Sequence, residues 1–419
     1  MHCVKPINPS LIDPDRHRRV LAIVGDTQVG LWVVRSMARN GLTVHAIVNS
    51  AEGQSAHSRY AASAWTLEHR PSQPGFADEI EELVRKLDVG SIMPVSEGYH
   101  NALIAARERF EPEVHLFSPS RELFDKSTDK DYLQTLCAEL GIPVAKGMCL
   151  DELMEEHGGE ALRFPLVLRT RRQNIDAGKV PLKAAYARDR AELDRWYEQF
   201  RSFADNVIVQ EYHPGAEEHV QILMHNGQAF ATGDYIGEHH MPLAGGVTTQ
   251  RISCHHQPVI DDTVKLLQAL GWQGIAGVQF HYDPETGQYI FLEINPRFSG
   301  GLPTVIMAGF EASFLLWQSH FEPEKMQKGS YKIGLRSRIL GGEANWLLGQ
   351  LRRDLLPPGQ KHLHPVVAVG TFIRHSFPPT RDDSFLWEDP KPFWADFKQM
   401  LKKLGARGHD IIGHPEGKV

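Results

Sequence analysis

Short apolar runs alternate with longer amphipathic segments over the first 118 residues. Residues 20–24 form an apolar run that ends at Gly25, and a helical pattern and a second apolar run follow. This alternation is typical of parallel strands joined by crossover helices. We therefore predict an α/β fold whose first unit, residues 19–118, is a doubly wound parallel sheet preceded by a polar tail at 1–18. The predicted strands are 20–24, 43–48, 91–95 and 114–117, and the predicted helices are 30–39, 76–87 and 101–109.

After residue 118 the pattern predicts helices and strands in a less regular order, which is typical of α+β subdomains. Asp283-Pro-Glu-Thr-Gly287 is a tight-turn sequence between two apolar runs, so we predict a hairpin there. The predicted helices are 125–140, 191–200, 261–270, 304–317 and 391–404. The predicted strands are 166–169, 207–211, 220–224, 228–232, 275–281, 289–294, 332–338 and 366–374.

Composition narrows the class of protein. The 419 residues are 42% hydrophobic and 23% charged, which is enough apolar material for a large core. The net charge of −7 is poorly suited to binding nucleic acid or an anionic membrane through bulk charge. The four cysteines are too scattered for a disulfide framework. Residues 1–19 contain no apolar run typical of a signal peptide, and no apolar run in the sequence is long enough for a membrane span. We therefore expect a cytoplasmic protein with no nucleic-acid or membrane partner.

The sharpest chemical signal lies on the two strands of the predicted hairpin. Glu293 and Asn295 are two residues apart on one strand, so their side chains share a face. Gln279 on the partner strand can join them across the hairpin. Three oxygen-bearing side chains at that density suit Mg²⁺. Arg297, just past the strand, offers a fork of donors to a phosphoryl group or a carboxylate.

Glu293-Ile-Asn-Pro-Arg297, with Gln279 upstream, resembles the metal site of the ATP-grasp superfamily. The choice of Gln, Glu and Asn is most similar to the carbamoyl-phosphate-synthetase-like branch. Ser58-Arg-Tyr60 and Asp389-Pro-Lys-Pro392 resemble motifs of the free-standing carboxylate–amine ligases. The resemblance implies four units: a pre-ATP-grasp domain at 19–118, an ATP-grasp N-terminal subdomain with its linker helix at 119–205, an ATP-grasp C-terminal subdomain at 206–350, and a C-terminal extension at 351–419.

The same resemblance implies roles for other residues. Lys130 and Arg169 take the positions of the cations that contact ATP phosphates. Gln210, Glu211 and Tyr212 lie in a segment similar to the hinge strand that reads adenine. Glu218, seven residues after Glu211, matches the ribose-binding carboxylate. The cofactors implied are ATP and Mg²⁺, with Mn²⁺ as the alternative metal.

The activity implied is ATP-dependent ligation of a carboxylate to an amine. ATP would phosphorylate the carboxylate, and the amine would then attack the acyl phosphate to give an amide, ADP and phosphate. Such chemistry relies on positioning and charge neutralisation, with Arg169 and Arg297 near the transferring group. The expected partners are ATP and small-molecule carboxylate and amine substrates, with a homodimer as an option.

The phosphate-covering loop departs from the family pattern. Such loops are usually glycine-rich, because backbone amides must approach phosphate closely. Here the matching stretch, residues 170–180, contains only Gly178. Arg171, Arg172 or Lys179 can offer side-chain donors in place of backbone ones.

The sequence leaves three other functions as alternatives to the ligase. One is a related ATP-grasp reaction with carbamate or bicarbonate chemistry, and another is a nucleotide-binding scaffold that has lost catalysis. The third is a Rossmann dehydrogenase, suggested by Gly25 and Gly30. That spacing is GxxxxG rather than GxGxxG, and Asn49 stands where a ribose-binding carboxylate is expected.

Several residues allow both a functional and a structural interpretation. Glu97 is either a helix-start carboxylate or a substrate contact. Arg336 and Arg338 share one face of a predicted strand, which is either solvated or binds a substrate carboxylate. The pairs His239-His240 and His255-His256, with Cys254 adjacent, suggest zinc, but adjacent strand residues point to opposite faces and no CxxC or HxxxH spacing accompanies them. We therefore expect loops there rather than a metal site.

Overall fold

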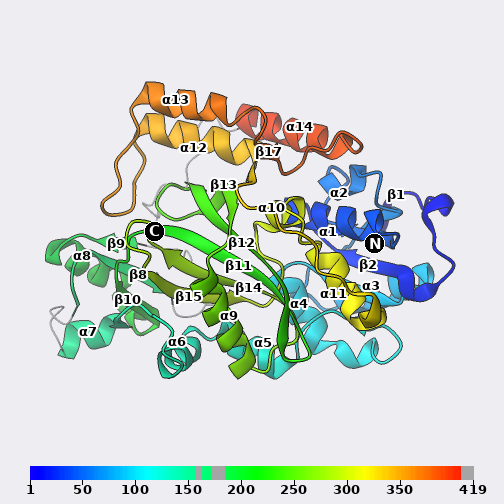
Figure 1. Cartoon of the computed structure of the whole chain (residues 1–419), viewed down its shortest axis with the longest axis horizontal. Helices are drawn as coiled ribbons and strands as arrows, with labels where there is room; N and C mark the ends of the chain where they lie inside the picture. The colour runs from blue at the N-terminus through cyan, green and yellow to red at the C-terminus, as the bar shows by residue number, and fades with distance from the viewer. Residues whose placement is uncertain (157–161, 171–184, 407–419) are drawn as a thin grey trace.

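The computed structural model describes residues 1–156, 162–170 and 185–406, arranged around three β-sheets (Figure 1). The sheets contain six, four and seven strands and follow one another along most of the chain. Among the described residues, no helix combines the length and the apolar composition needed to cross a bilayer.

The first sheet confirms the predicted doubly wound unit. Its order is β1-β4-β3-β2-β5-β6, and every pair is parallel except β1 with β4. All six residues of β3 are buried, because helices cover both faces of a parallel sheet. The strands are β1 His2–Lys5, β2 Arg19–Ile23, β3 Thr43–Val48, β4 Ser63–Thr66, β5 Ser91–Pro94 and β6 His115–Leu116. The helices are η1 Pro9–Leu11, η2 Arg16–Arg18, α1 Gln28–Arg39, α2 Gln54–His57, α3 Phe76–Leu87, α4 Glu97–Ala105 and η3 Arg107–Arg109.

The sequence pattern predicts a polar tail at residues 1–18, but this segment is part of the first sheet. β1 lies within it and adds an antiparallel edge strand to the sheet. Lys5 Nζ also donates to the backbone carbonyls of Ser58 and Ala61. The segment has no apolar run, so the hydrophobic pattern did not reveal the strand.

The second sheet is antiparallel, in the order β7-β10-β8-β9. The boundary predicted at 205/206 assigned β10 to the next subdomain, whereas β10 pairs with β7 and β8 here. The predicted helix 125–140 is two helices, because the Asp129 side chain accepts from the backbone N–H groups of Asp131 and Tyr132 and starts a new helix. The strands are β7 Gly147–Cys149, β8 Leu166–Thr170, β9 Ala185–Ala187 and β10 Val207–Glu211, and the helices are α5 Arg121–Thr128, α6 Lys130–Glu139, α7 Leu150–Glu156, α8 Arg190–Phe200 and η4 Arg201–Asn206.

The third sheet has the order β15-β14-β11-β12-β13-β16-β17 and is antiparallel except for the pair β16-β17. One face carries an apolar core in which Val220, Val278 and Phe280 cluster with Val259 and Leu266 of α9. The strands are β11 Ala216–His225, β12 Gln228–Met241, β13 Val247–Cys254, β14 Gly274–Tyr282, β15 Tyr289–Asn295, β16 Arg336–Arg338 and β17 Arg381–Asp382. The helices are α9 Gln257–Ala269, α10 Leu302–Met307, α11 Ala312–Phe321 and η5 Pro323–Lys325. The predicted helix 304–317 thus falls on two helices, and the predicted strand 332–338 is strand only at its end.

The C-terminal extension is mainly helical (Figure 1). α12 Leu340–Arg352 leads into it, and α13 Pro365–Arg374 and α14 Lys391–Ala406 lie within it. The strand predicted at 366–374 was wrong, because this segment is α13. Pro365 occupies the first turn, where its missing N–H costs nothing, and the His364 side chain caps the Val366 N–H.

Two motifs far apart in the sequence meet where this extension contacts the first unit. Asp389 accepts hydrogen bonds from Ser58 Oγ at 2.7 Å and from the backbone N–H of Arg59 at 2.8 Å. Arg35 Nε donates to the same carboxylate at 3.0 Å, and both side chains of this ion pair are at most 1% exposed. The pair therefore joins the extension to the first sheet through a buried charge contact.

A buried histidine in the first sheet predicts a pH-dependent stability. Burial lowers the pKa of His45 on β3 to about 4, from 6.5 in the unfolded chain. The unfolded state therefore binds the proton more readily, and stability is lost as pH falls from 6.5 towards 4. We expect the His45→Gln variant to lose about 2 kcal/mol less than the wild type between pH 7 and pH 5. Urea unfolding at both pH values measures this, with His57→Gln, at an exposed position, as the control that should behave like the wild type.

Candidate functional site

The three predicted metal ligands lie on one face of the third sheet. Gln279 on β14 pairs directly with Glu293 on β15, and Gly277 pairs with Asn295. Directly opposite residues share a face in an antiparallel pair, and so do residues two apart on one strand. Asn295 Nδ2 lies 3.5 Å from Glu293 Oε1, and the Glu293 side chain is 28% exposed. The hairpin therefore gathers an amide oxygen from each of two side chains and one accessible carboxylate.

Lys130 and Glu97 come to the same place from other parts of the chain. Both line a pocket of about 660 Å³ together with Glu293 and Asn295. Lys130 Nζ lies 3.8 Å from Glu293 Oε2. Burial lowers the pKa of the Lys130 ammonium, and the neighbouring Arg169 lowers it further while Glu293 and Glu97 oppose the shift.

Local sequence explains both positions. Lys130 is the first residue of α6, directly after the capping Asp129, and Glu97 is the first residue of α4. Burial raises the pKa of the Glu97 carboxyl, and the charge of Glu293 adds to this, while Arg297 and Lys130 oppose it. Helix starts thus deliver one cation and one acid into the pocket.

Arg297 and Arg169 flank this group. The backbone N–H of Arg297 donates to the Asn295 carbonyl at 2.7 Å, which forms a turn directly after β15, and its Nη1 donates to the Phe298 carbonyl. Arg169 on β8 is close enough to Lys130 and His281 for its charge to lower both of their pKa values. The charges of Arg169 and Arg297 therefore act on two residues of the pocket, Lys130 and Glu97 respectively.

The predicted hinge residues lie at the end of β10. Gln210 is buried, and Glu211 Oε1 accepts from the backbone N–H of Arg163 at 3.1 Å. The backbone N–H of Tyr212 donates to the Pro165 carbonyl at 2.9 Å. The Tyr212 ring packs edge-to-face on Tyr186 with centroids 5.9 Å apart. The Glu211 carboxylate and the Tyr212 ring thus both contact other residues of the protein.

The structure does not bring Glu218 to this face. On β11, Glu218 pairs with Phe280, whereas its neighbours Glu217 and His219 pair with His281 and Gln279. Glu218 therefore points to the opposite face, where it is fully buried. Glu217 is the carboxylate that shares the face of Gln279.

Sequence reasoning did not single out Glu217, His219 or His281. Burial alone would raise the pKa of the Glu217 carboxyl, but contacts with His219 at 3.6 Å and His240 at 3.4 Å hold it well below its usual range. Burial lowers the pKa of His281 to about 4, so this ring is neutral. The two-residue period of a strand could have identified His281, because it lies two residues after Gln279 on the same predicted strand.

Arg336 and Arg338 contact other groups. Arg336 binds Glu238 with two hydrogen bonds, of 2.5 and 2.6 Å. Arg338 Nη1 donates to Ser376 Oγ at 3.1 Å, just after α13. Neither lines the pocket of Glu97 and Lys130. The phosphate-loop residues Arg171, Arg172, Gly178 and Lys179 lie outside the described residues.

Parts of this chain are similar in sequence to known proteins. Residues 203–336 match the family model described as "ATP-grasp in the biosynthetic pathway with Ter operon". The carbamoyl phosphate synthase large chain, N-terminal section, of Methanopyrus kandleri is 24% identical over 203 residues, which cover 45% of this chain and 35% of that protein. The arginine-specific large chain of Bacillus subtilis is 24% identical over 293 residues, which cover 67% of this chain and 25% of that protein. This chain thus spans about a third or less of the length of these relatives.

Solved structures show the same fold. Biotin carboxylase from Campylobacter jejuni superposes with a TM-score of 0.59 at 15% identity, covering 76% of this chain and 74% of that one. N5-carboxyaminoimidazole synthetase from Staphylococcus aureus, complexed with ADP, gives a TM-score of 0.55 at 15% identity, covering 76% and 80%. At these identities the likeness concerns the fold alone, and it agrees with the α/β architecture described above.

Proposed function

We propose that this chain, which carries an ATP-grasp domain, is an ATP-dependent ligase that joins a carboxylate to an amine through an acyl phosphate. The observation that carries this proposal is the pocket in which Glu97, Lys130, Glu293 and Asn295 meet from three separate segments. It combines oxygen ligands for a divalent cation with a buried ammonium, which is what phosphoryl transfer from ATP requires.

The donor set of Gln279, Glu293 and Asn295 fits Mg²⁺, or Mn²⁺ in its place. All three offer hard oxygen atoms from one strand pair, and their number leaves room for water and phosphate oxygens. When bound, the metal would neutralise charge on the ATP phosphates. Lys130, 3.8 Å from Glu293, would add a second positive charge beside it.

The chain's own residues would then orient the reacting groups. In the first step the carboxylate oxygen bonds to the γ-phosphorus, the bond from that phosphorus to the bridging oxygen breaks, and ADP leaves. Arg169 and Arg297 would hold the transferring group in line. In the second step the amine attacks the acyl carbon, phosphate leaves with the oxygen it received, and the amine loses a proton. Glu97 would accept a hydrogen bond from the amine.

The adenine and ribose of ATP would lie towards β10 and β11. Gln210, Glu211 and Tyr212 would border adenine. For the ribose we propose Glu217 in place of Glu218, because Glu217 shares the sheet face with Gln279. Contacts with two imidazoles keep the pKa of Glu217 low, so it is ionised and ready to accept hydrogen bonds from hydroxyl groups.

Replacing Lys130 with methionine tests the phosphate contact. We expect KM for ATP to rise about 10- to 100-fold, because a hydrogen bond from a charged group contributes roughly 1.5–3 kcal/mol. Steady-state kinetics with varied ATP measure the effect. Lys126→Met, at an exposed position on α5 four residues earlier, should leave KM unchanged, and equal KM values for both variants would contradict the assignment.

The ligase activity itself is tested by a phosphate-release screen. The full chain is incubated with ATP, Mg²⁺ and pooled carboxylates and amines, and products are identified by mass. We expect phosphate and ADP to form only in pools that contain the substrate carboxylate. We expect an amide when the matching amine is also present. ATP binding without turnover on any pool would favour a nucleotide-binding scaffold, and turnover that requires bicarbonate alone would favour carbamate chemistry.

A further inference from the structure

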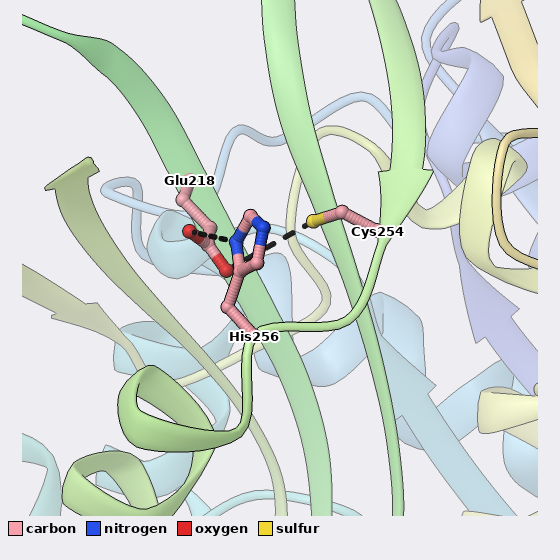
Figure 2. Close-up of side chains that lie close together, drawn as sticks. All are labelled: Glu218, Cys254 and His256. Atoms are coloured by element: carbon pink, nitrogen blue, oxygen red, sulfur yellow. Dashed lines mark hydrogen bonds and ion pairs between the residues drawn. The ribbon is translucent and has the colours of Figure 1, made fainter. Parts of the chain in front are cut away.

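A second group of chemically reactive side chains lies on the other face of the third sheet. Glu218 comes from β11, Cys254 from the end of β13, and His256 from the turn before α9 (Figure 2). His256 Nδ1 lies 2.9 Å from Glu218 Oε2, and Cys254 Sγ lies 3.9 Å from Glu218 Oε1. One donor atom from each of the three residues lies within 4.8 Å of the other two.

A fourth donor stands beside them. Asp234 on β12 is fully buried, and its Oδ2 lies 3.8 Å from Cys254 Sγ and accepts the backbone N–H of His256 at 2.9 Å. Its Oδ1 is buried and makes no hydrogen bond, and His255 Nδ1 is 3.6 Å away. A buried carboxylate oxygen without a hydrogen bond is costly unless a cation is nearby.

Glu218 and Asp234 are both fully buried. Their ion-pair partners among the described residues are the imidazoles of His256 and His255, which carry positive charge only when protonated. Two carboxylates removed from water need a compensating charge or must take up protons. A thiol at 3.9 Å adds a further group that can become an anion.

We propose that Glu218, Cys254 and His256, with Asp234 as fourth donor, bind a divalent cation of the zinc class. Thiolate, imidazole and carboxylate are the ligands that zinc takes in proteins, and sulfur disfavours Mg²⁺ and Ca²⁺. Zinc bond lengths of about 2.0–2.3 Å place tetrahedral ligand atoms about 3.3–3.6 Å apart. The two observed separations, 2.9 and 3.9 Å, lie on either side of this range. Binding would replace the thiol proton, which is released to solvent.

The site is distinct from that of Gln279 and Glu293, because the two donor sets face opposite sides of the sheet. The metal would tie β11, β13 and the start of α9 together. The His256 ring is already oriented by stacking on Tyr282, with centroids 4.2 Å apart. We therefore assign the site a structural role rather than a catalytic one.

Cobalt(II) titration of the metal-stripped full chain, with excess Mg²⁺ present, tests the site. A thiolate ligand gives a sulfur-to-cobalt charge-transfer band that oxygen ligands alone do not give. We expect this band to saturate at one equivalent and to disappear on addition of one equivalent of Zn²⁺. Zn²⁺ should also raise the thermal unfolding midpoint of the stripped protein.

Matched variants locate the band. Cys254→Ser should abolish it, whereas Cys149→Ser, at a half-exposed cysteine on β7, and Glu293→Gln should both retain it. Absence of the band in folded wild-type protein would overturn the proposal, and this result does not depend on whether Cys254→Ser folds. A band that survives Cys254→Ser would also overturn it. Because Glu293→Gln removes only the other site, failure here is distinguishable from failure of the proposed ligase.

Discussion

Replacing Glu293 with glutamine is expected to lower kcat for ATP cleavage about 10²- to 10⁴-fold, while the fold is kept. Glu293 is the one carboxylate among the three proposed Mg²⁺ ligands, and it also contacts Lys130 at 3.8 Å. Its loss would remove the negative charge proposed to hold the cation, and a metal contributes several kcal/mol of charge stabilisation in such transfers. Phosphate release and circular dichroism measure the two properties separately.

Glu285→Gln is the matched control. Glu285 lies in the exposed turn of the same hairpin, between β14 and β15, so the substitution makes the same chemical change eight residues before Glu293. We expect wild-type kcat for this variant. If Glu293→Gln retained wild-type phosphate release, the metal assignment would be wrong.

Replacing Asp389 with asparagine is expected to lower the free energy of unfolding by about 3–5 kcal/mol. The substitution leaves the fully buried Arg35 guanidinium without its charged partner, and it weakens the contacts to Ser58 and Arg59. Breaking one side of a buried ion pair is costly because an uncompensated charge stays buried. Urea unfolding followed by fluorescence measures the change.

Glu388→Gln, at the exposed neighbouring position, should change the free energy of unfolding by less than about 0.5 kcal/mol. The double variant Arg35→Met with Asp389→Leu should recover much of the loss, since it removes both buried charges. Equal effects of Asp389→Asn and Glu388→Gln would show that the ion pair does not stabilise the contact between the extension and the first unit.

The sequence was most informative where pattern and chemistry were local. Each of β2, β3, β5, β14 and β15 contains a short apolar run, which located the strand in the sequence. The shared face of Glu293 and Asn295 then followed from the two-residue period. Gln279 could be added because a tight turn sets the register of a hairpin.

Prediction failed where polarity hid a strand or where a local preference was overridden. Ala216-Glu-Glu-His219 has no hydrophobic alternation, so the predicted strand begins at 220 instead of at the observed start of β11. The sequence pattern therefore did not show that Glu217 and Glu218 lie on one strand and point to opposite faces. The valines of α13 favour a strand locally, but the segment packs as a helix beside α12. Tertiary context decided both cases.

The cluster of Glu218, Cys254 and His256 shows a further limit of spacing rules. Adjacent residues on one strand point to opposite faces. Here, however, β13 ends at Cys254, and the chain turns so that His256 approaches the same point. The third member is 36 residues from Cys254 and enters through the pairing of β11, β12 and β13. Only the sheet topology brings these residues together.

Oxygen-18 transfer tests the acyl-phosphate pathway most directly. The carboxylate found in the phosphate-release screen is labelled in its carboxyl group and incubated with the full chain, ATP, Mg²⁺ and the amine. We predict ADP as the nucleotide product and one labelled oxygen in each phosphate released, because the phosphate keeps the oxygen it received from the carboxylate. Unlabelled phosphate alongside amide formation, or AMP as the nucleotide product, would contradict the account.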